Sequence, residues 1–286
     1  MNLTTELLLL LIDKPTKRTT ARLVKWLQKK RLLARKMLCR ICGRRMKMKR
    51  RHDTSDGFHW ECRHKSHRDR KCSRTVRAKS LFQNSKRSLS SWMTFIYRFS
   101  QGLHLRQIDM MQDGIARSSR TMSKMAATLR KVCKCAMRRY TRRSGQIIGH
   151  PREFAVIDES SFCHKRKRRG RQNLVPIVVK HVRPGTTIIS DEWRAYRGAL
   201  AAMGYTHFRV NHRQWFVDPH SGAHTQHLER AWLKYKSTIW RLRGNRTEKI
   251  LKQHLSVIEW THWLAVKHSQ GPLGRLLKDI RHHYPV

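Results

Sequence analysis

Acidic residues are scarce in this chain, whose 286 residues include 18 Asp and Glu against 64 Lys and Arg. The resulting formal net charge of +46 opposes a compact state by self-repulsion unless polyanions neutralise it. Nucleic acid, held through its phosphates, is therefore the expected partner. The nine Trp residues indicate a folded core rather than a disordered basic tail. A purely structural nucleic-acid binder, such as a ribosomal protein, is the alternative class.

Long apolar runs are absent as well. A membrane-spanning helix needs roughly 18 apolar residues, and the run from Leu7 to Ile12, flanked by Glu6 and Asp13, is far shorter. The N-terminus also lacks the positive region and the small-residue cleavage site of a signal peptide. We therefore expect a short buried helix here and no membrane partner.

Cysteine is infrequent and odd in number, and four of the seven Cys gather in one segment. This distribution argues against a disulfide framework and for a metal site in a reducing compartment. A Cys-x-x-Cys pair, followed about twenty residues later by two more Cys, is typical of a structural zinc ribbon, which we place at residues 37–80. The expected zinc ligands are Cys39, Cys42, Cys62 and Cys72.

Two alternatives to this ligand set stay open. The second Cys pair encloses nine residues, a looser spacing than usual, and His64 and His67 lie between its members. Either His is a substitute for one Cys, although four thiolates are favoured because thiolate is the softer zinc ligand. The other alternative is four reduced, buried Cys without metal.

Three carboxylates stand where ligands gather in an open α/β sheet. The β-branched run Thr186–Ile189 predicts a strand followed by Asp191, and residues 153–158 predict a strand that ends in Asp158. Glu229 borders the apolar stripe of a predicted helix. Such a set suits two divalent ions roughly 3.5–4 Å apart acting on a phosphodiester. Ordinary solvated carboxylates are the alternative, although the scarcity of acids makes their grouping less ordinary.

Several segments carry a family resemblance. Residues 155–159, 174–177, 182–196, 210–212, 216–219 and 224–229 resemble a DDE transposase of the Merlin superfamily, similar to certain bacterial insertion-sequence transposases. The most specific pieces are Ser-Asp-x-Trp-x-x-Tyr at 190–196 and His-Thr-x-x-x-Glu-x-x-Trp at 224–232, taken together.

The resemblance implies an RNase H-like domain over residues 153–267, in which Asp158, Asp191 and Glu229 hold magnesium or manganese. It also implies cleavage at transposon ends, strand transfer into target DNA, and a DNA contact by Lys236. The expected partner is thus double-stranded DNA, with a homodimer as one option. The basic run at 164–171, with Lys165, Arg166, Lys167 and Arg168, fits a DNA-gripping loop or a nuclear import signal. A nuclear location is expected.

The spacing of the first two carboxylates departs from that family. The residues between Asp158 and Asp191 (159–190) number 32, and an RNase H-like fold usually places two strands and a helix there. Leu174–His181 predicts the helix, but residues 163–173 are almost entirely Lys, Arg and Gly. We therefore expect a sheet that lacks two strands and exposes an edge beside Asp158. This favours a rival function, a catalytically impaired or co-opted DNA-binding protein.

Helical patterns fill most of the remaining chain. Residues 1–36 predict a basic helical lead-in, and residues 88–140 a helix-turn-helix-like region whose last helix starts at Ser118 or Ser119. The residues expected to face DNA are Arg117, Arg120, Lys124 and Arg130. A helical hairpin that only packs is the alternative. A final helix is expected at 247–267 with Trp263 in the core, followed by a frayed basic tail at 268–286.

Overall fold

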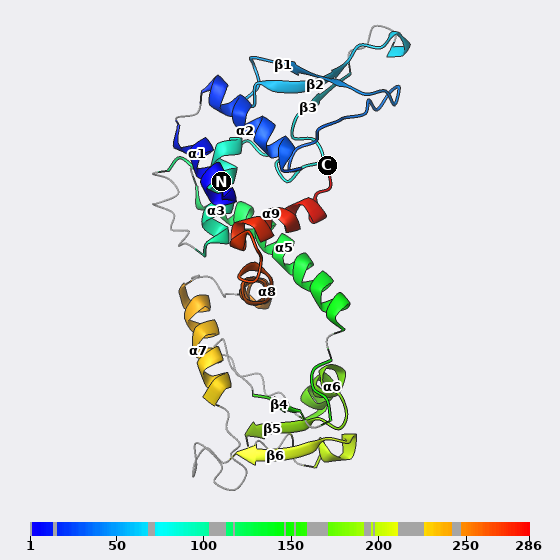
Figure 1. Cartoon of the computed structure of the whole chain (residues 1–286), viewed down its shortest axis with the longest axis vertical. Helices are drawn as coiled ribbons and strands as arrows, with labels where there is room; N and C mark the ends of the chain where they lie inside the picture. The colour runs from blue at the N-terminus through cyan, green and yellow to red at the C-terminus, as the bar shows by residue number, and fades with distance from the viewer. Residues whose placement is uncertain are drawn as a thin grey trace. The chain divides into compact units, whose positions relative to one another are not determined.

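The chain forms a mixed α/β structure of helices and small sheets in a computed structural model (Figure 1). It divides into two compact units: unit 1 comprises Met1–Met137 and Glu259–Val286, and unit 2 is Arg138–Ile258. Each unit is described by itself below. The structure describes all residues except 1, 14–15, 68–71, 103–112, 117, 146, 152, 159–170, 192–195, 197, 211–225 and 242–246.

Unit 1 is built on helices whose apolar faces pack together. Its main helices are α1 (Leu3–Ile12), α2 (Lys17–Lys29), α3 (Leu89–Ser100), α9 (Gly271–His283) and the part of α5 (Ser119–Ser144) up to Met137. Both α1 and α3 contact α2 and α9. In α2, Leu23 and Leu27 are buried while Arg22 and Lys25 face outward, which is the pattern of an amphipathic helix. Of residues 1–36, expected to be helical, the segments of α1 and α2 are helical and residues 30–36 are not; the apolar stripe of α2 belongs to the core.

Helix α5 begins and packs as its pattern predicts. Ser118 Oγ accepts a hydrogen bond from the Thr121 N–H at 3.3 Å, which caps the helix. The residues expected on its inward face are all buried, namely Met122, Met125, Ala126, Leu129, Val132, Cys133 and Ala136. The short helix expected at residues 105–111 lies outside the described residues, so the helix-turn-helix stays a prediction.

The C-terminal residues overturn the expectation of a frayed basic tail. Helix α9 occupies most of residues 268–286, and Leu273, Leu276, Leu277 and Ile280 are each at most 2% exposed. Their spacing of three, one and three residues forms one apolar stripe. The basic residues of this segment lie between the apolar positions. The expectation of a frayed tail rested on charge alone and therefore missed an amphipathic helix.

Trp260, not Trp263, is the aromatic core residue at the end of α8 (Glu248–Trp260). Trp260 is 1% exposed and its Nε1 donates to Asp279 Oδ2 at 2.8 Å, whereas Trp263 is 51% exposed. The chain continues as a π-helix at Thr261–Ala265, which changes the face that later side chains present. The expectation of one regular helix with Trp263 in the core is therefore wrong.

Residues 37–80 contain a three-stranded antiparallel sheet in the order β1-β2-β3, with bounds Lys47–Arg50, Phe58–Cys62 and Cys72–Thr75. Its two faces differ, because successive side chains of a strand point to opposite sides. Trp60 and Cys62 lie on the face that joins a buried apolar cluster with Met37, Met46 and Ala78. His59 and Glu61 occupy the other face. We call that second face the polar face of the ribbon.

A buried ion pair fixes the turn between β1 and β2. Arg77 donates from Nη2 and Nε to the two carboxylate oxygens of Asp56, each at 2.5 Å, and both residues are about 5% exposed. Arg77 Nη1 also donates to the carbonyl oxygens of Ser85 and Arg87 at 2.8 and 2.7 Å. One guanidinium therefore joins the sheet to the segment that leads into α3.

Unit 2 contains a second three-stranded sheet, in which β4 (Phe154–Val156), β5 (Thr187–Asp191) and β6 (Thr206–Val210) run parallel in that order. All three strands lie where their sequences predict them. Helix α6 (Arg171–His181) forms the crossover from β4 to β5 and lies beside the sheet (Figure 1). The buried core between them consists of Ala155, Leu174, Val178, Val182, Ile188, Tyr196, Leu200 and Tyr205.

Two further features complete unit 2. The turn before β6 ends a 3₁₀ helix, Ala201–Met203, at Gly204, whose φ of 80° is the left-handed conformation expected of that residue. Helix α7 (Gln226–Arg241) carries Glu229, and Ile239 is the buried member of its predicted apolar stripe. None of the helices described in either unit combines the length and apolarity that crossing a membrane requires.

Candidate functional site

Three of the four predicted zinc ligands lie together with His67. The Nε2 atom of His67 is 3.5 Å from Cys39 Sγ and 3.9 Å from Cys62 Sγ, and Cys42 Sγ is 3.7 Å from Cys62 Sγ. All four donor atoms lie within 4.8 Å of one another. The strands explain this convergence, because the Cys-x-x-Cys turn precedes β1, Cys62 ends β2, and His67 ends a short 3₁₀ turn beyond it.

The fourth predicted ligand, Cys72, stands beside this cluster. It opens β3, pairs with Cys62 in the sheet register, and hydrogen-bonds to the Cys39 thiol. Burial raises the pKa of Cys39, but hydrogen bonds from the backbone N–H groups of Cys42 and Ile41, and with neighbouring thiols, bring that pKa down to about 6. A low thiol pKa favours the thiolate, the form that binds metal.

The donor chemistry fits a structural zinc ion. Thiolates and one imidazole are the usual ligands of tetrahedral zinc sites, and three Cys with one His is a common set. Trp60 and Met46 pack around the cluster and give it an apolar shell. Residues 37–80 therefore hold a Cys/His cluster compatible with zinc. From the sequence, His67 was only a substitute for one of the four Cys ligands. In the structure it lies within the cluster.

The two predicted Asp residues lie at the ends of neighbouring strands, Asp158 just after β4 and Asp191 as the last residue of β5. Val156 of β4 pairs with Ile189 of β5, and the Ile157 N–H donates to the Ile189 carbonyl oxygen at 2.9 Å, so the register continues towards residues 158 and 191. Alternate residues share a face of a sheet, and Val156 and Ile189 pack together on the face away from α6. Asp158 and the backbone of Asp191 thus lie at one edge of the sheet; the side chain of Asp191 lies outside what the structure describes.

Helix α7 reaches this edge through Trp232. The indole Nε1 of Trp232 donates to Asp158 Oδ2 at 2.9 Å, across 74 residues of sequence. Trp232 is three residues after Glu229, so the two residues lie about one turn apart on neighbouring positions of the helix surface. Glu229 is exposed and Asp158 is half-buried. From the sequence, Trp232 was assigned to the apolar stripe and to the resembling segment 224–232, and neither assignment predicts its polar contact with Asp158.

The predicted DNA-contacting residues fall into three groups. On α5, Arg120 and Lys124 are exposed, whereas Arg130 is half-buried and burial lowers the pKa of its guanidinium. On α7, Lys236 is half-buried two turns beyond Glu229. The residues that lie outside the described part of the chain are Arg117, Lys165, Arg166, Lys167 and Arg168. These assignments stay predictions.

The segment that carries the carboxylates can be compared with known families. Residues 134–260 match the family model of the ISXO2-like transposase domain. The match contains all of unit 2 and supports a transposase family for the chain. No curated protein and no solved structure matches. The ribbon and the first helices lie before the matched residues.

Proposed function

We propose that this protein is a DDE transposase that binds transposon-end DNA and catalyses metal-dependent strand cleavage and strand transfer. The observation that carries the proposal is the approach of α7 to the ends of β4 and β5, within the segment that matches a transposase domain. Asp158, Asp191 and Glu229 are the proposed metal ligands. An RNase H-like sheet and membership of the Merlin superfamily are parts of the same proposal.

The donor set suits magnesium or manganese. Carboxylate oxygens are the ligands that these hard cations prefer, and a transposase family typically works with divalent metals. When bound, two such ions would supply activation of the attacking oxygen and stabilisation of the leaving oxygen of a phosphodiester. The protein's own contribution is to hold the carboxylates: Trp232 fixes one oxygen of Asp158, and the parallel register of β4 and β5 sets the spacing of residues 158 and 191.

The proposed partners follow from charge and family. A formal net charge of +46 favours duplex DNA, as transposon ends and as target. Arg120 and Lys124 on the exposed face of α5 are proposed contacts to that duplex. A nuclear location and a homodimer are proposed with it.

One observation favours a second candidate, a catalytically impaired or co-opted DNA-binding protein. In the described part of unit 2 the sheet has three parallel strands, and β4 has β5 as its paired neighbour there. An RNase H-like fold usually adds a hairpin beside the first Asp strand. Residues 159–170, where such a hairpin would begin, lie outside the described residues.

The deciding experiment is cleavage of supercoiled plasmid that carries the DNA flanking this gene. The purified chain is incubated with Mg²⁺ or Mn²⁺, and nicked and linear products are quantified. We expect metal-dependent nicking in the wild type and loss of about a hundredfold or more in Asp158→Asn, Asp191→Asn and Glu229→Gln.

The matched control is Glu153→Gln, which removes an acid at the opposite end of β4 from Asp158. This variant should keep wild-type nicking. Duplex binding without any metal-dependent nicking would favour the co-opted candidate. Equal nicking by wild type and all three triad variants would mean that the carboxylates have no catalytic role.

A further inference from the structure

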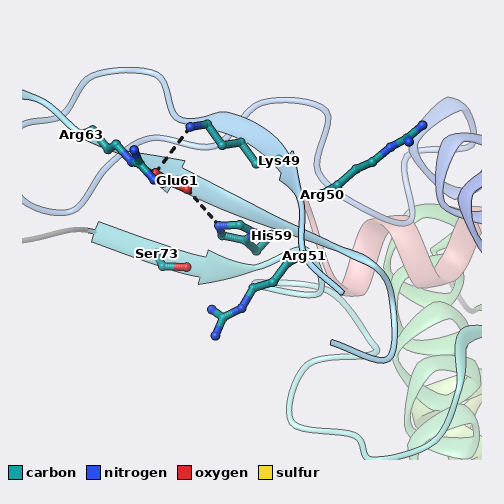
Figure 2. A pocket seen from close by; sticks show the side chains of 7 residues that line it. All are labelled: Lys49, Arg50, Arg51, His59, Glu61, Arg63 and Ser73. Atoms are coloured by element: carbon teal, nitrogen blue, oxygen red, sulfur yellow. Dashed lines mark hydrogen bonds and ion pairs between the residues drawn. The ribbon is translucent and has the colours of Figure 1, made fainter. Parts of the chain in front are cut away.

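The polar face of the ribbon contains a charged pocket away from the Cys/His cluster (Figure 2). The pocket has a volume of about 510 Å³. Its lining residues are Lys49, Arg50, Arg51, His59, Glu61, Arg63 and Ser73. Four of these side chains are cationic and one is anionic, so the pocket attracts anions. All three strands of the ribbon, or their immediate ends, contribute to it.

Glu61 organises the cations around the pocket. Its carboxylate accepts from Arg63 and from His59 Nε2 at 3.1 Å, and Lys49 Nζ lies 3.6 Å away. The Glu61 side chain is only 3% exposed, whereas the side chains of Lys49 and Arg63 are 45% and 63% exposed. The carboxylate therefore lies at the floor and holds cationic groups whose other donors face solvent. Figure 2 shows these contacts as dashed lines to Glu61.

His59 is held beside Glu61 through its Nε2. The residue is 7% exposed and lines the pocket. Beside it, Arg51 extends along the Ser73 side of the pocket in Figure 2 and is held by Asp53 at 2.7 and 2.8 Å.

We infer that the polar face of the ribbon is a phosphate-binding site for the backbone of duplex DNA, with Lys49, Arg51 and Arg63 as its contacts. Guanidinium groups match phosphate geometry with two parallel hydrogen bonds, and lysine adds a point charge. Lys49 lies in β1 and Arg51 directly follows the last residue of that strand, so the two residues, two positions apart, continue one face of the strand. Glu61 is too deeply buried to meet a phosphate and instead fixes the groups that do.

This site deepens the proposed function, because it takes its nucleic-acid partner from there and assigns part of the binding to residues outside the matched transposase domain. A phosphate clamp positions DNA without reading its sequence. The site is therefore expected to work on any duplex, in the absence of Mg²⁺.

The test measures binding of the full chain to a labelled duplex of mixed sequence, in magnesium-free buffer over a series of salt concentrations. No chelator is added, so that the Cys/His cluster keeps any bound metal. The variants are Arg51→Ala, Arg63→Ala and their double. The matched control is the double Arg18→Ala/Arg22→Ala, which removes the same charge from exposed residues of α2 that do not line the pocket.

We expect each single variant to weaken binding about tenfold and to lower the salt slope by about one, while the control double changes neither beyond its loss of net charge. Glu61→Gln removes a negative charge. If the cations formed a disorganised basic patch, this variant would bind the duplex more tightly than the wild type. If Glu61 organises the site, the variant binds the duplex more weakly. Zinc content and the circular dichroism spectrum of each variant confirm folding.

Two results would overturn the inference. Equal losses in the test and control doubles would show that only net charge matters. Wild-type binding that is unchanged in the Arg51→Ala/Arg63→Ala double would place the DNA elsewhere, with the proposed function intact. Absence of duplex binding by the wild type at low salt would instead remove the DNA-binding part of the proposed function itself.

Discussion

The two units of this chain are stabilised in different ways. In unit 1, polar groups are buried in pairs and clusters: the Arg77–Asp56 ion pair, the Trp260–Asp279 hydrogen bond and the Cys/His cluster. In unit 2, the main core is a set of eight buried residues between α6 and a three-stranded sheet. Phe154 of β4 is 69% exposed, and Phe208 of β6 is 44% exposed. The proposed chemistry therefore lies in the unit with the less extensive core.

This difference corresponds to two different requirements of the proposed function, DNA binding and strand cleavage. The proposed DNA binding by unit 1 needs cations at fixed spacing, which buried ion pairs and the Cys/His cluster would provide. In unit 2, Asp158 lies at the end of the sheet and accepts a hydrogen bond from Trp232. We therefore predict that single substitutions in unit 1 mainly lower the free energy of unfolding, whereas single substitutions in unit 2 mainly lower the rate of DNA cleavage.

Disruption of the Cys/His cluster should have the largest effect, and that effect should be confined to unit 1. The double variant Cys39→Ser/Cys42→Ser removes two thiolates, and structural zinc contributes on the order of 10 kcal/mol in small domains. We expect residues 37–80 to lose protection in hydrogen exchange while β4–β6 keep theirs. Cys135→Ser, a half-buried Cys outside the cluster, is the control. Equal loss of protection in both units would show that they do not fold separately.

Cobalt binding identifies the fourth ligand of the cluster. Because His67 lies within the donor cluster, His67→Ala should weaken cobalt binding more than Cys72→Ser does. Cobalt absorption reports the number of coordinating thiolates directly. A greater loss in Cys72→Ser would restore the four-Cys set expected from the sequence.

The buried ion pair of the ribbon comes next in size. Arg77→Ala leaves Asp56 charged and without its partner in a buried site, which is unfavourable by about 3–5 kcal/mol. Thermal or urea unfolding of the full chain measures this loss. Arg51→Ala breaks the exposed pair with Asp53 in the same module and should leave the unfolding midpoint unchanged. Similar losses in both variants would mean that burial does not govern these pairs.

Helix α9 offers a third test of unit 1. Leu276 is fully buried, so Leu276→Ala should lower the free energy of unfolding by about 2–5 kcal/mol. Lys278→Ala, an exposed position on the same helix, should be neutral. If both variants were neutral, residues 268–286 would be the frayed tail that their composition suggests.

The smallest effect on stability is expected in unit 2. Trp232→Phe keeps the ring packing but removes the hydrogen bond to Asp158, with a loss of about 1 kcal/mol. Cleavage should nevertheless fall about tenfold at saturating DNA, because Asp158 loses the group that orients it. Trp263→Phe, at an exposed Trp, should change neither quantity. A stability loss without a change in cleavage would make Trp232 a packing residue only.

Local sequence patterns predicted the elements that depend on local rules. The strand at 187–191 follows from a β-branched run, and the inward face of α5 follows from helical spacing. The clustering of Cys39, Cys42 and Cys62 follows from the spacing of a ribbon. Each of these signals lies within about twenty residues of sequence.

Local sequence rules could not predict contacts between polar residues that lie far apart in the sequence. Nothing in the sequence pairs Arg77 with Asp56 or Trp232 with Asp158, because hydrogen-bond geometry is set by the packed structure. The polar face of the ribbon was partly readable: His59 and Glu61 alternate on a strand beside a basic strand. The apolar stripe of α9 was also readable, but the charge of that segment concealed it.

Unit 1 is discontinuous in the chain, and this has a consequence for synthesis on the ribosome. Helix α9 and the Asp279 that accepts from Trp260 are translated after the whole of unit 2. The nascent ribbon and first helices must therefore wait, with part of their apolar surface uncovered, until the last residues emerge. A premature stop codon shortly before α9 would leave the matched transposase segment intact, yet release a product whose other unit cannot close.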